Sequence, residues 1–194
     1  SCAIAHFNVA YAAGQMTKAT LLPRGTVLKS RPVRGVPCTF RTAYDVTLAP
    51  LEVSAARFSS AVAAPSGTLL PKGGTSVMSI QLQLTGTQTS WATLGLDKVR
   101  VYVDAEASQV SAVREALQGK VVGVLLQGTE HGPWQAVPDA LPGVVGFADD
   151  EALIEVDARS QPAYRHLTEF FAFPDKFNFV DLVLPPAVIT TSSR

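Results

Sequence analysis

The sequence has little charge and no excess of either sign. Charged side chains make up 16% of its 194 residues, and 16 basic residues balance 16 acidic ones, whereas a typical soluble domain carries about 25% charged residues. Without surplus Lys and Arg to neutralise phosphates, the composition argues against a nucleic-acid partner. The longest apolar runs, such as residues 121–126, fall far short of the ~18 residues that a membrane-spanning helix needs, so we expect no membrane insertion.

Cysteine and histidine are scarce. Cys2 and Cys38 are the only cysteines, too few for a disulfide framework. Both lie in apolar, strand-like stretches, and we expect both to be buried free thiols in a reducing compartment. The three histidines, His6, His131 and His166, are far apart in the chain and lack the short spacing of a zinc site. The sequence therefore predicts no metal and no other cofactor.

Motifs of catalysis and nucleotide binding are missing. The chain has no Gly-x-Ser-x-Gly sequence around a nucleophile. Its glycine-rich residues 72–76 lack the order of a phosphate-binding loop. The adjacent acidic residues 149–151 cannot converge on one ion unless the backbone loops around it, so we expect a solvated turn or a helix start there. These absences favour a role other than that of an enzyme.

Two alternative functions stay open at this level. A small β-sandwich domain that binds a ligand or hydrolyses a substrate would need Glu130, His131 and residues 149–151 to converge in one cleft. A carbohydrate- or peptide-binding module would need Trp91 and Trp134, the only tryptophans, on one exposed face. The structure can test each alternative by where it places these residues.

Alternation of apolar and polar residues predicts several antiparallel strands. The alternation is cleanest over residues 38–48, where every second side chain from Cys38 to Leu48 shares one mostly apolar face. We expect one long strand there, and a loop-rich segment over residues 128–146. Further strands are expected at residues 2–11, 26–29, 51–59, 77–84, 98–104, 120–127 and 177–184.

Two short helices are predicted. Residues 108–118 place apolar side chains at i, i+3 and i+7, and Gly119 follows them. Residues 162–171 begin with Pro162 in the first turn, and Ser160 is the candidate N-cap. The apolar stripe of this second helix, which we expect to pack on the core, consists of Tyr164, Leu167, Phe170 and Phe171.

These elements together predict an α+β, β-rich fold. We expect mostly antiparallel sheets, sandwich- or barrel-like, with about two short helices. The chain divides into two expected lobes, an antiparallel β lobe over residues 1–105 and an α+β lobe over residues 106–194. It begins at Ser1 within a strand-like run and stops without a tail of distinct composition, so we expect it to be an internal part of a longer protein.

One segment carries a specific family resemblance. Residues 164–177 read Tyr-Arg-His-Leu-Thr-Glu-Phe-Phe-Ala-Phe-Pro-Asp-Lys-Phe. This run resembles Tyr-Arg-Leu-Leu-x-Glu-Tyr-Phe-Ala-Phe-Pro-Glu-Lys-Phe of the TssF family, also described as VasA or ImpG, a baseplate component of the type VI secretion system. The mild departures are His166, Phe170 and Asp175. Residues 22–26, 38–46 and 96–104 are similar to other family segments in the same order, so the resemblance covers essentially the whole chain.

The resemblance implies a structural role without catalysis. A TssF-like protein would belong to the cytoplasmic baseplate of a contractile, phage-tail-like apparatus, near the inner face of the inner membrane. Its implied partners are TssG, TssK and a second copy of TssF. No catalytic residue is carried over by the resemblance, and the chain is expected to be an internal part of such a protein.

Candidate interface residues come from two places. Arg41 and Asp45 share the polar face of the strand expected at 38–48, about 13 Å apart at 3.3 Å per residue, so we expect each to pair with a neighbouring strand. The aromatic segment 164–177 is either a helix-to-strand corner packed into the core or a source of rings that face a partner. Its candidate residues are Tyr164, Arg165, Glu169, Phe170, Phe171, Phe173, Pro174, Lys176 and Phe177.

Overall fold

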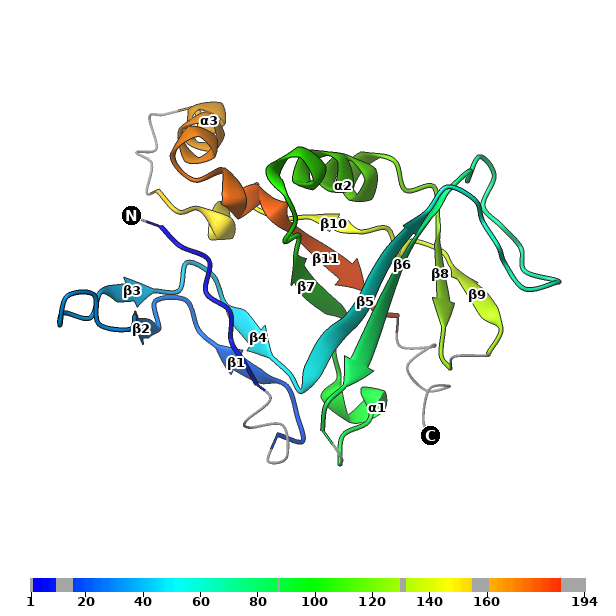
Figure 1. Cartoon of the computed structure of the whole chain (residues 1–194), viewed down its shortest axis with the longest axis horizontal. Helices are drawn as coiled ribbons and strands as arrows, with labels where there is room; N and C mark the ends of the chain where they lie inside the picture. The colour runs from blue at the N-terminus through cyan, green and yellow to red at the C-terminus, as the bar shows by residue number, and fades with distance from the viewer. Residues whose placement is uncertain (1, 10–15, 87, 130–131, 155–160, 186–194) are drawn as a thin grey trace.

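The computed structural model describes residues 2–9, 16–86, 88–129, 132–154 and 161–185. These residues form short antiparallel strands together with a few helices (Figure 1). In chain order the elements are β1 (Thr20–Leu22), β2 (Val27–Lys29), β3 (Thr39–Arg41), β4 (Val46–Leu48), β5 (Leu51–Ser59), β6 (Val77–Leu84), α1 (Trp91–Leu94), β7 (Lys98–Tyr102), α2 (Ala107–Gly119), β8 (Val124–Gln127), β9 (Trp134–Val137), β10 (Gly143–Val144), η1 (Asp149–Glu151), α3 (Pro162–Ala172), η2 (Pro174–Asn178) and β11 (Phe179–Val183).

The predicted α+β, β-rich, mostly antiparallel fold is confirmed. The strands of the described residues close no barrel, because four of their sheets have only two strands and the fifth has three. The two predicted helices are confirmed as α2 and α3. The N-cap of α3 is Gln161 and not the expected Ser160, which lies outside the described residues. The single turn α1 was not predicted from the sequence; Ser90 and Thr93 form a capping box at its start, and Gly95 ends it.

The three-stranded sheet β10-β11-β7 holds the core. β11 is its central strand and pairs with β7 over five residues, from Phe179 opposite Tyr102 to Val183 opposite Lys98. Helix α2 contacts β11, and Figure 1 shows α2 and α3 on the same side of β7 and β11. The central strand buries Val180 completely. A strand with a neighbour on both edges and a helix over one face is the place where a core can form.

The long strand expected over residues 38–48 is wrong as one element. β3 pairs with β2, β4 pairs with β1, and the chain bends between β3 and β4. The opposite chain turns between β1 and β2 at Gly25, whose φ of +85° is a left-handed conformation that glycine adopts without strain. Because the segment that pairs with residues 38–48 turns at Gly25, these residues form two short strands and not one. The alternation of their side chains nevertheless continues across both strands.

Other strand predictions also need correction. Residues 2–9 form no strand, since alternation alone supplies no neighbour to pair with, and residues 10–11 of that prediction lie outside the described part of the chain. The strand expected at 120–127 begins only at Val124, and β9 and β10 occupy the segment expected to be a loop.

The prediction that both cysteines are buried is wrong, because Cys2 and Cys38 are exposed. The two-lobe division stays a prediction; β7 of the first expected lobe pairs with β11 of the second.

Candidate functional site

Helix α3 packs with its apolar stripe facing outward, which overturns the expected orientation. Tyr164 is 67% exposed, Leu167 56% and Phe171 82%, whereas Arg165 and Glu169 retain only 7% and 1%. Arg165 and Glu169 are four residues apart and so lie on one helical face. The charged face is therefore the buried one, and the apolar face meets solvent.

Both carboxylate oxygens of Glu169 accept hydrogen bonds. Its Oε2 pairs with the ammonium of Lys176, and both side chains are fully buried. Its Oε1 accepts the backbone N–H groups of Leu153 at 2.8 Å and Ile154 at 3.1 Å. Burial raises the pKa of Glu169, but the hydrogen bonds from Lys176 and the two amides outweigh burial, so the net pKa lies below 4.5. The pair joins α3, η2 and the segment after η1.

Arg165 fixes the segment that leads into η1. Its guanidinium bonds the carboxylate of Asp149 at 2.9 Å and the carbonyl oxygens of Phe147 at 2.9 Å and Ala148 at 3.3 Å. A planar guanidinium can satisfy several acceptors at once. Arg165 and Glu169 therefore act as structural anchors beneath α3, and neither side chain is available to a partner.

The acidic residues 149–151 do not form an ion site. Asp149 and Asp150 are exposed within η1, as the expected solvated helix start would have them, while Glu151 is buried. Glu151 accepts the N–H of Gly146 at 2.6 Å and pairs with Arg100 at 2.8 Å. Within the described residues, no three His, Cys, Asp or Glu side chains are grouped so that they could hold a metal.

A second ionic cluster ties β7 to β11. The carboxylate of Asp181 accepts two hydrogen bonds from the guanidinium of Arg100, at 2.7 and 2.9 Å, and one from the ammonium of Lys98, at 3.0 Å. Burial raises the pKa of Asp181, but the two cations outweigh burial and bring the net pKa below 3.8. The guanidinium carbon of Arg100 lies 5.8 Å from the centre of the Tyr44 ring. The pKa of the Tyr44 phenol is raised, mainly by burial and to a smaller extent by repulsion from Glu151. Sequence reasoning missed Arg100 and Asp181; a charged pair at matching positions of two apolar strands was the only available signal.

The aromatic segment divides between core and surface. Phe177 is buried, as the helix-to-strand corner predicts, and its ring lies 5.0 Å from Phe147 and 6.0 Å from Phe170. Phe173 is half-buried and ends α3 by donating its backbone N–H to the backbone carbonyl oxygen of Glu169, and Pro174 begins η2. Phe177 therefore confirms the packed corner, whereas the exposed rings of Tyr164 and Phe171 leave contact with a partner a prediction.

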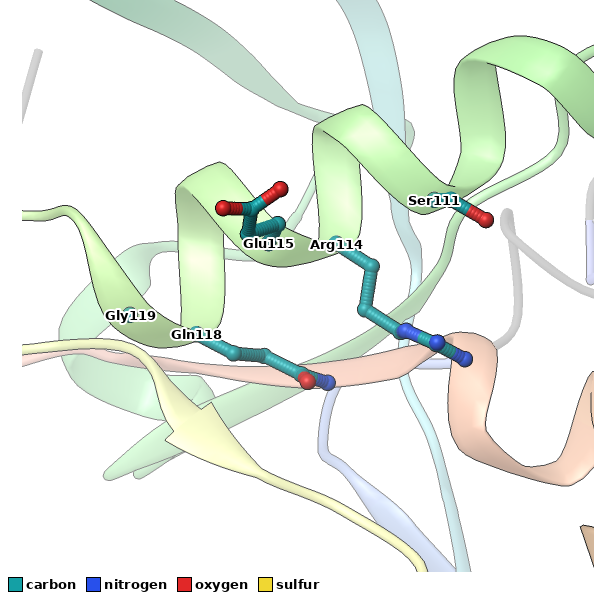
Figure 2. A pocket seen from close by; sticks show the side chains of 5 residues that line it. All are labelled: Ser111, Arg114, Glu115, Gln118 and Gly119. Atoms are coloured by element: carbon teal, nitrogen blue, oxygen red, sulfur yellow. The ribbon is translucent and has the colours of Figure 1, made fainter.

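A groove of about 250 Å³ opens between α2 and α3 beside these rings. Its lining combines apolar side chains with a guanidinium, an amide and an imidazole. The lining residues are Arg114, Gln118, Phe147, His166, Leu167, Phe170 and Phe177. Figure 2 shows a neighbouring depression along α2, which shares Arg114 and Gln118 with the groove; both side chains extend from α2 toward the segment that leads into β11, while Glu115 points away from that segment.

Arg41 and Asp45 are not brought to α3. Asp45 accepts the backbone N–H of Arg24 at 2.7 Å, so it pairs with the neighbouring chain as expected, and Arg41 is exposed at the end of β3. Arg24 itself reaches the carbonyl oxygens of Asp150 at 3.1 Å and Ala152 at 3.0 Å. Arg24 therefore connects the β1–β2 turn to η1, a contact that no motif indicated.

Neither alternative function gains support. Glu130 and His131 lie outside the described residues, and the carboxylates of Asp149 and Glu151 bond different partners. Trp91 in α1 and Trp134 in β9 are both half-buried, so they do not form one exposed face. In the described ranges, no helix has the length and apolar content to cross a bilayer.

Comparison with known proteins identifies the family. Residues 1–193 match the family described as type VI secretion system, TssF. The chain is 29% identical over 171 residues to type VI secretion system component TssF1 of Pseudomonas aeruginosa PAO1, an alignment that covers 87% of this chain and 28% of that protein. A chain in the cryo-electron microscopy structure of the type VI secretion TssK-TssF-TssG baseplate subcomplex has a similar fold, with a TM-score of 0.68 and 24% identity over 89% of this chain and 31% of that one.

These matches agree with the resemblance carried by residues 164–177, which is thereby confirmed. The chain spans less than a third of the length of the relatives that it matches. With the family match extending over nearly every residue, the chain belongs to the TssF family of the type VI secretion system.

Proposed function

We propose that this chain is part of a structural subunit of the type VI secretion baseplate, which acts through protein–protein contacts and carries out no catalytic step. Its proposed partners are TssG, TssK and a second copy of TssF, in a contractile, phage-tail-like apparatus assembled in the cytoplasm at the inner membrane. Family membership and the likeness to a chain of a TssK-TssF-TssG subcomplex support this role.

The outward apolar face of α3 is the observation that carries the proposal. Aromatic side chains are enriched at the centres of protein interfaces, and Tyr164, Leu167 and Phe171 project from one helical face into solvent. Burying charged residues on the opposite face is costly unless they are fully paired. Arg165 pairs with Asp149 and Glu169 pairs with Lys176, and these two ion pairs favour the orientation of α3 that presents the rings outward.

Matched substitutions in the full-length protein test this role. Phe171→Ser removes an exposed ring from α3, and Phe58→Ser removes a similarly exposed ring from β5. The full-length protein and each variant are co-expressed with TssG and TssK, and the recovered complex and its dissociation constant are measured. We expect Phe171→Ser to weaken binding about 30-fold, the effect of losing a hot spot worth about 2 kcal/mol, and Phe58→Ser to leave binding close to wild type.

Thermal melts establish that both variants are folded, as expected for substitutions of exposed side chains. Failure of the wild-type protein to assemble with TssG and TssK would overturn the baseplate role. Assembly that is unaffected by Phe171→Ser, or weakened equally by both variants, would remove α3 as the interface.

A further inference from the structure

We infer that the groove between α2 and α3 receives a segment of another protein that places one large apolar side chain in the groove and a carboxylate beside it, against Arg114. This inference rests on the proposed function, because it specifies the chemistry of the partner that the α3 surface contacts.

The size and lining of the groove favour a single side chain. Its volume of about 250 Å³ is below the ~300–1,000 Å³ of typical small-molecule pockets. Buried Phe177 and the partly exposed rings of Phe147 and Phe170 supply apolar surface, and Leu167 continues that surface onto the outer face of α3. A helix or loop that covers α3 would therefore fill this depression with one anchor residue, as in helix-in-groove recognition.

Arg114 supplies the electrostatic part of the inference. The two arginines beneath α3 and beside β11 each bond a carboxylate, Arg165 with Asp149 and Arg100 with Asp181. Arg114 is half-buried, yet within the described part of the chain its only hydrogen bond is a long one of 3.4 Å to the neutral amide oxygen of Asn178, and it has no ion pair.

No carboxylate lines the groove, so Arg114 lacks the kind of partner that Arg165 and Arg100 have. The adjacent Glu115 points away and pairs with Lys120 on the surface. A half-buried guanidinium gains most from a carboxylate, which it can bind through two parallel hydrogen bonds. The missing acceptor is therefore expected to come from the partner, next to its apolar anchor.

A second copy of this chain fits the groove less well. In a two-fold contact each copy presents the same patch to the other, and that patch brings Arg114 but no lining carboxylate. The pairing would place like charges together at the centre of the interface. A different chain with an acidic, apolar segment complements the groove in both shape and charge.

Site-specific cross-linking in the assembled complex tests the inference. A photoreactive benzoylphenylalanine replaces Leu167 in the full-length protein, which is co-expressed with TssG and TssK, and the captured peptide is sequenced by mass spectrometry. We expect a peptide of TssG or TssK in which the captured apolar residue has an Asp or Glu within about one helical turn.

Charge reversal then separates a specific contact from simple proximity. Arg114→Glu should lower the cross-linking yield about tenfold or more, because it sets two carboxylates against each other, whereas Arg114→Lys should retain most of the yield. Lys72→Glu, at an exposed lysine outside the groove, makes the same change in net charge and should have little effect. Replacing the captured acid by Arg should restore cross-linking to Arg114→Glu.

The outcomes distinguish this inference from the baseplate role. If the complex assembles but the cross-link captures a second copy, a segment of the same chain or a peptide without an acid, the inference is wrong while the proposed function stands. The same holds if Arg114→Glu leaves the yield unchanged. If no complex with TssG and TssK forms, the proposed function fails, and this inference fails with it.

Discussion

The two halves of the chain differ in how they bury side chains. Among the described residues from 2 to 86, Pro50 is the only buried one. Residues 88–185 contain every buried large apolar side chain of the described ranges, including Leu117, Phe177 and Val180. The first half folds into two-stranded hairpins, and the second builds a three-stranded sheet with helices against it. An isolated hairpin is marginal on its own, whereas a covered sheet can enclose a core.

The same comparison explains where apolar surface remains. Several large apolar side chains of the first half are exposed, and in that half no layer of the described chain covers them. They are Leu21, Val27, Val33, Val36, Val53, Phe58, Leu69 and Leu70. The second half also leaves an apolar surface, but there it is concentrated on α3 above a charged interior. We therefore expect substitutions in the second half to affect folding and those in the first half to affect folding little.

The buried pair of Glu169 and Lys176 should give the largest effect. Lys176→Met leaves the carboxylate of Glu169 buried without its cation, which costs about 3–5 kcal/mol in the free energy of unfolding. The double variant Glu169→Gln/Lys176→Met should recover much of that loss, since no lone charge is then buried. Denaturant unfolding measures both.

Lys120→Met is the matched control for the buried pair. Lys120 pairs with Glu115 at 2.8 Å, but both side chains are well exposed, and solvent screens exposed ion pairs so that they contribute little to stability. Equal losses from Lys176→Met and Lys120→Met would contradict the structural role assigned to the charged face of α3.

A matched pair of leucine substitutions compares the two halves directly. Leu117 is buried in α2 and Leu21 is exposed in β1. Leu117→Ala should destabilise the chain by about 2–5 kcal/mol through the lost contacts and the cavity, whereas Leu21→Ala should stay within about 0.5 kcal/mol. If Leu21→Ala lowers the free energy of unfolding as much as Leu117→Ala does, the stated difference in burial between the two halves is wrong.

Helix α3 shows what the sequence could predict and what it could not. Its position followed from Pro162 in the first turn and from the spacing of its apolar residues, and both ends lie within a residue of expectation. The predicted orientation of α3 was wrong, because apolar periodicity identifies the buried face of a helix only when that face packs against apolar side chains. Here Arg165 and Glu169 find acceptors and donors in residues 147–154 and in η2, and such long-range partners leave no periodic signal.

The strand expected over residues 38–48 shows a second limit. The even-numbered side chains from Phe40 to Leu48 are all partly buried, so the predicted face is correct. The continuity of the strand was not predictable, because it depends on a turn at Gly25 in a different segment. Local patterns thus indicated the types of most elements and the buried face of this segment, while strand pairing and the groove between α2 and α3 depended on contacts distant in sequence.

Acid should weaken the second half selectively. Glu169 and Asp181 have pKa values below the ordinary 4.5 and 3.8, since their hydrogen-bonded cations outweigh the effect of burial. A carboxylate with a lowered pKa contributes stability above its ordinary pKa and loses it as the pH falls through the folded value. We expect the free energy of unfolding to be steady above about pH 5 and to decline below it. Asp181→Asn removes one such group and should flatten this decline; an unchanged slope would rule out its contribution.

The contact made by Arg24 should give the smallest effect, and it tests whether this contact couples the two halves. Its guanidinium bonds the carbonyl oxygens of Asp150 and Ala152 from an exposed position. Arg24→Ala should therefore cost only about 1 kcal/mol. Arg41→Ala, at another exposed arginine, should cost within about 0.5 kcal/mol. Hydrogen exchange locates the difference: in Arg24→Ala, faster exchange should appear around η1 and the β1–β2 turn. Identical exchange in both variants would mean that Arg24 does not couple the hairpins to the sheet, leaving the Tyr44–Arg100 contact as the connection to test next.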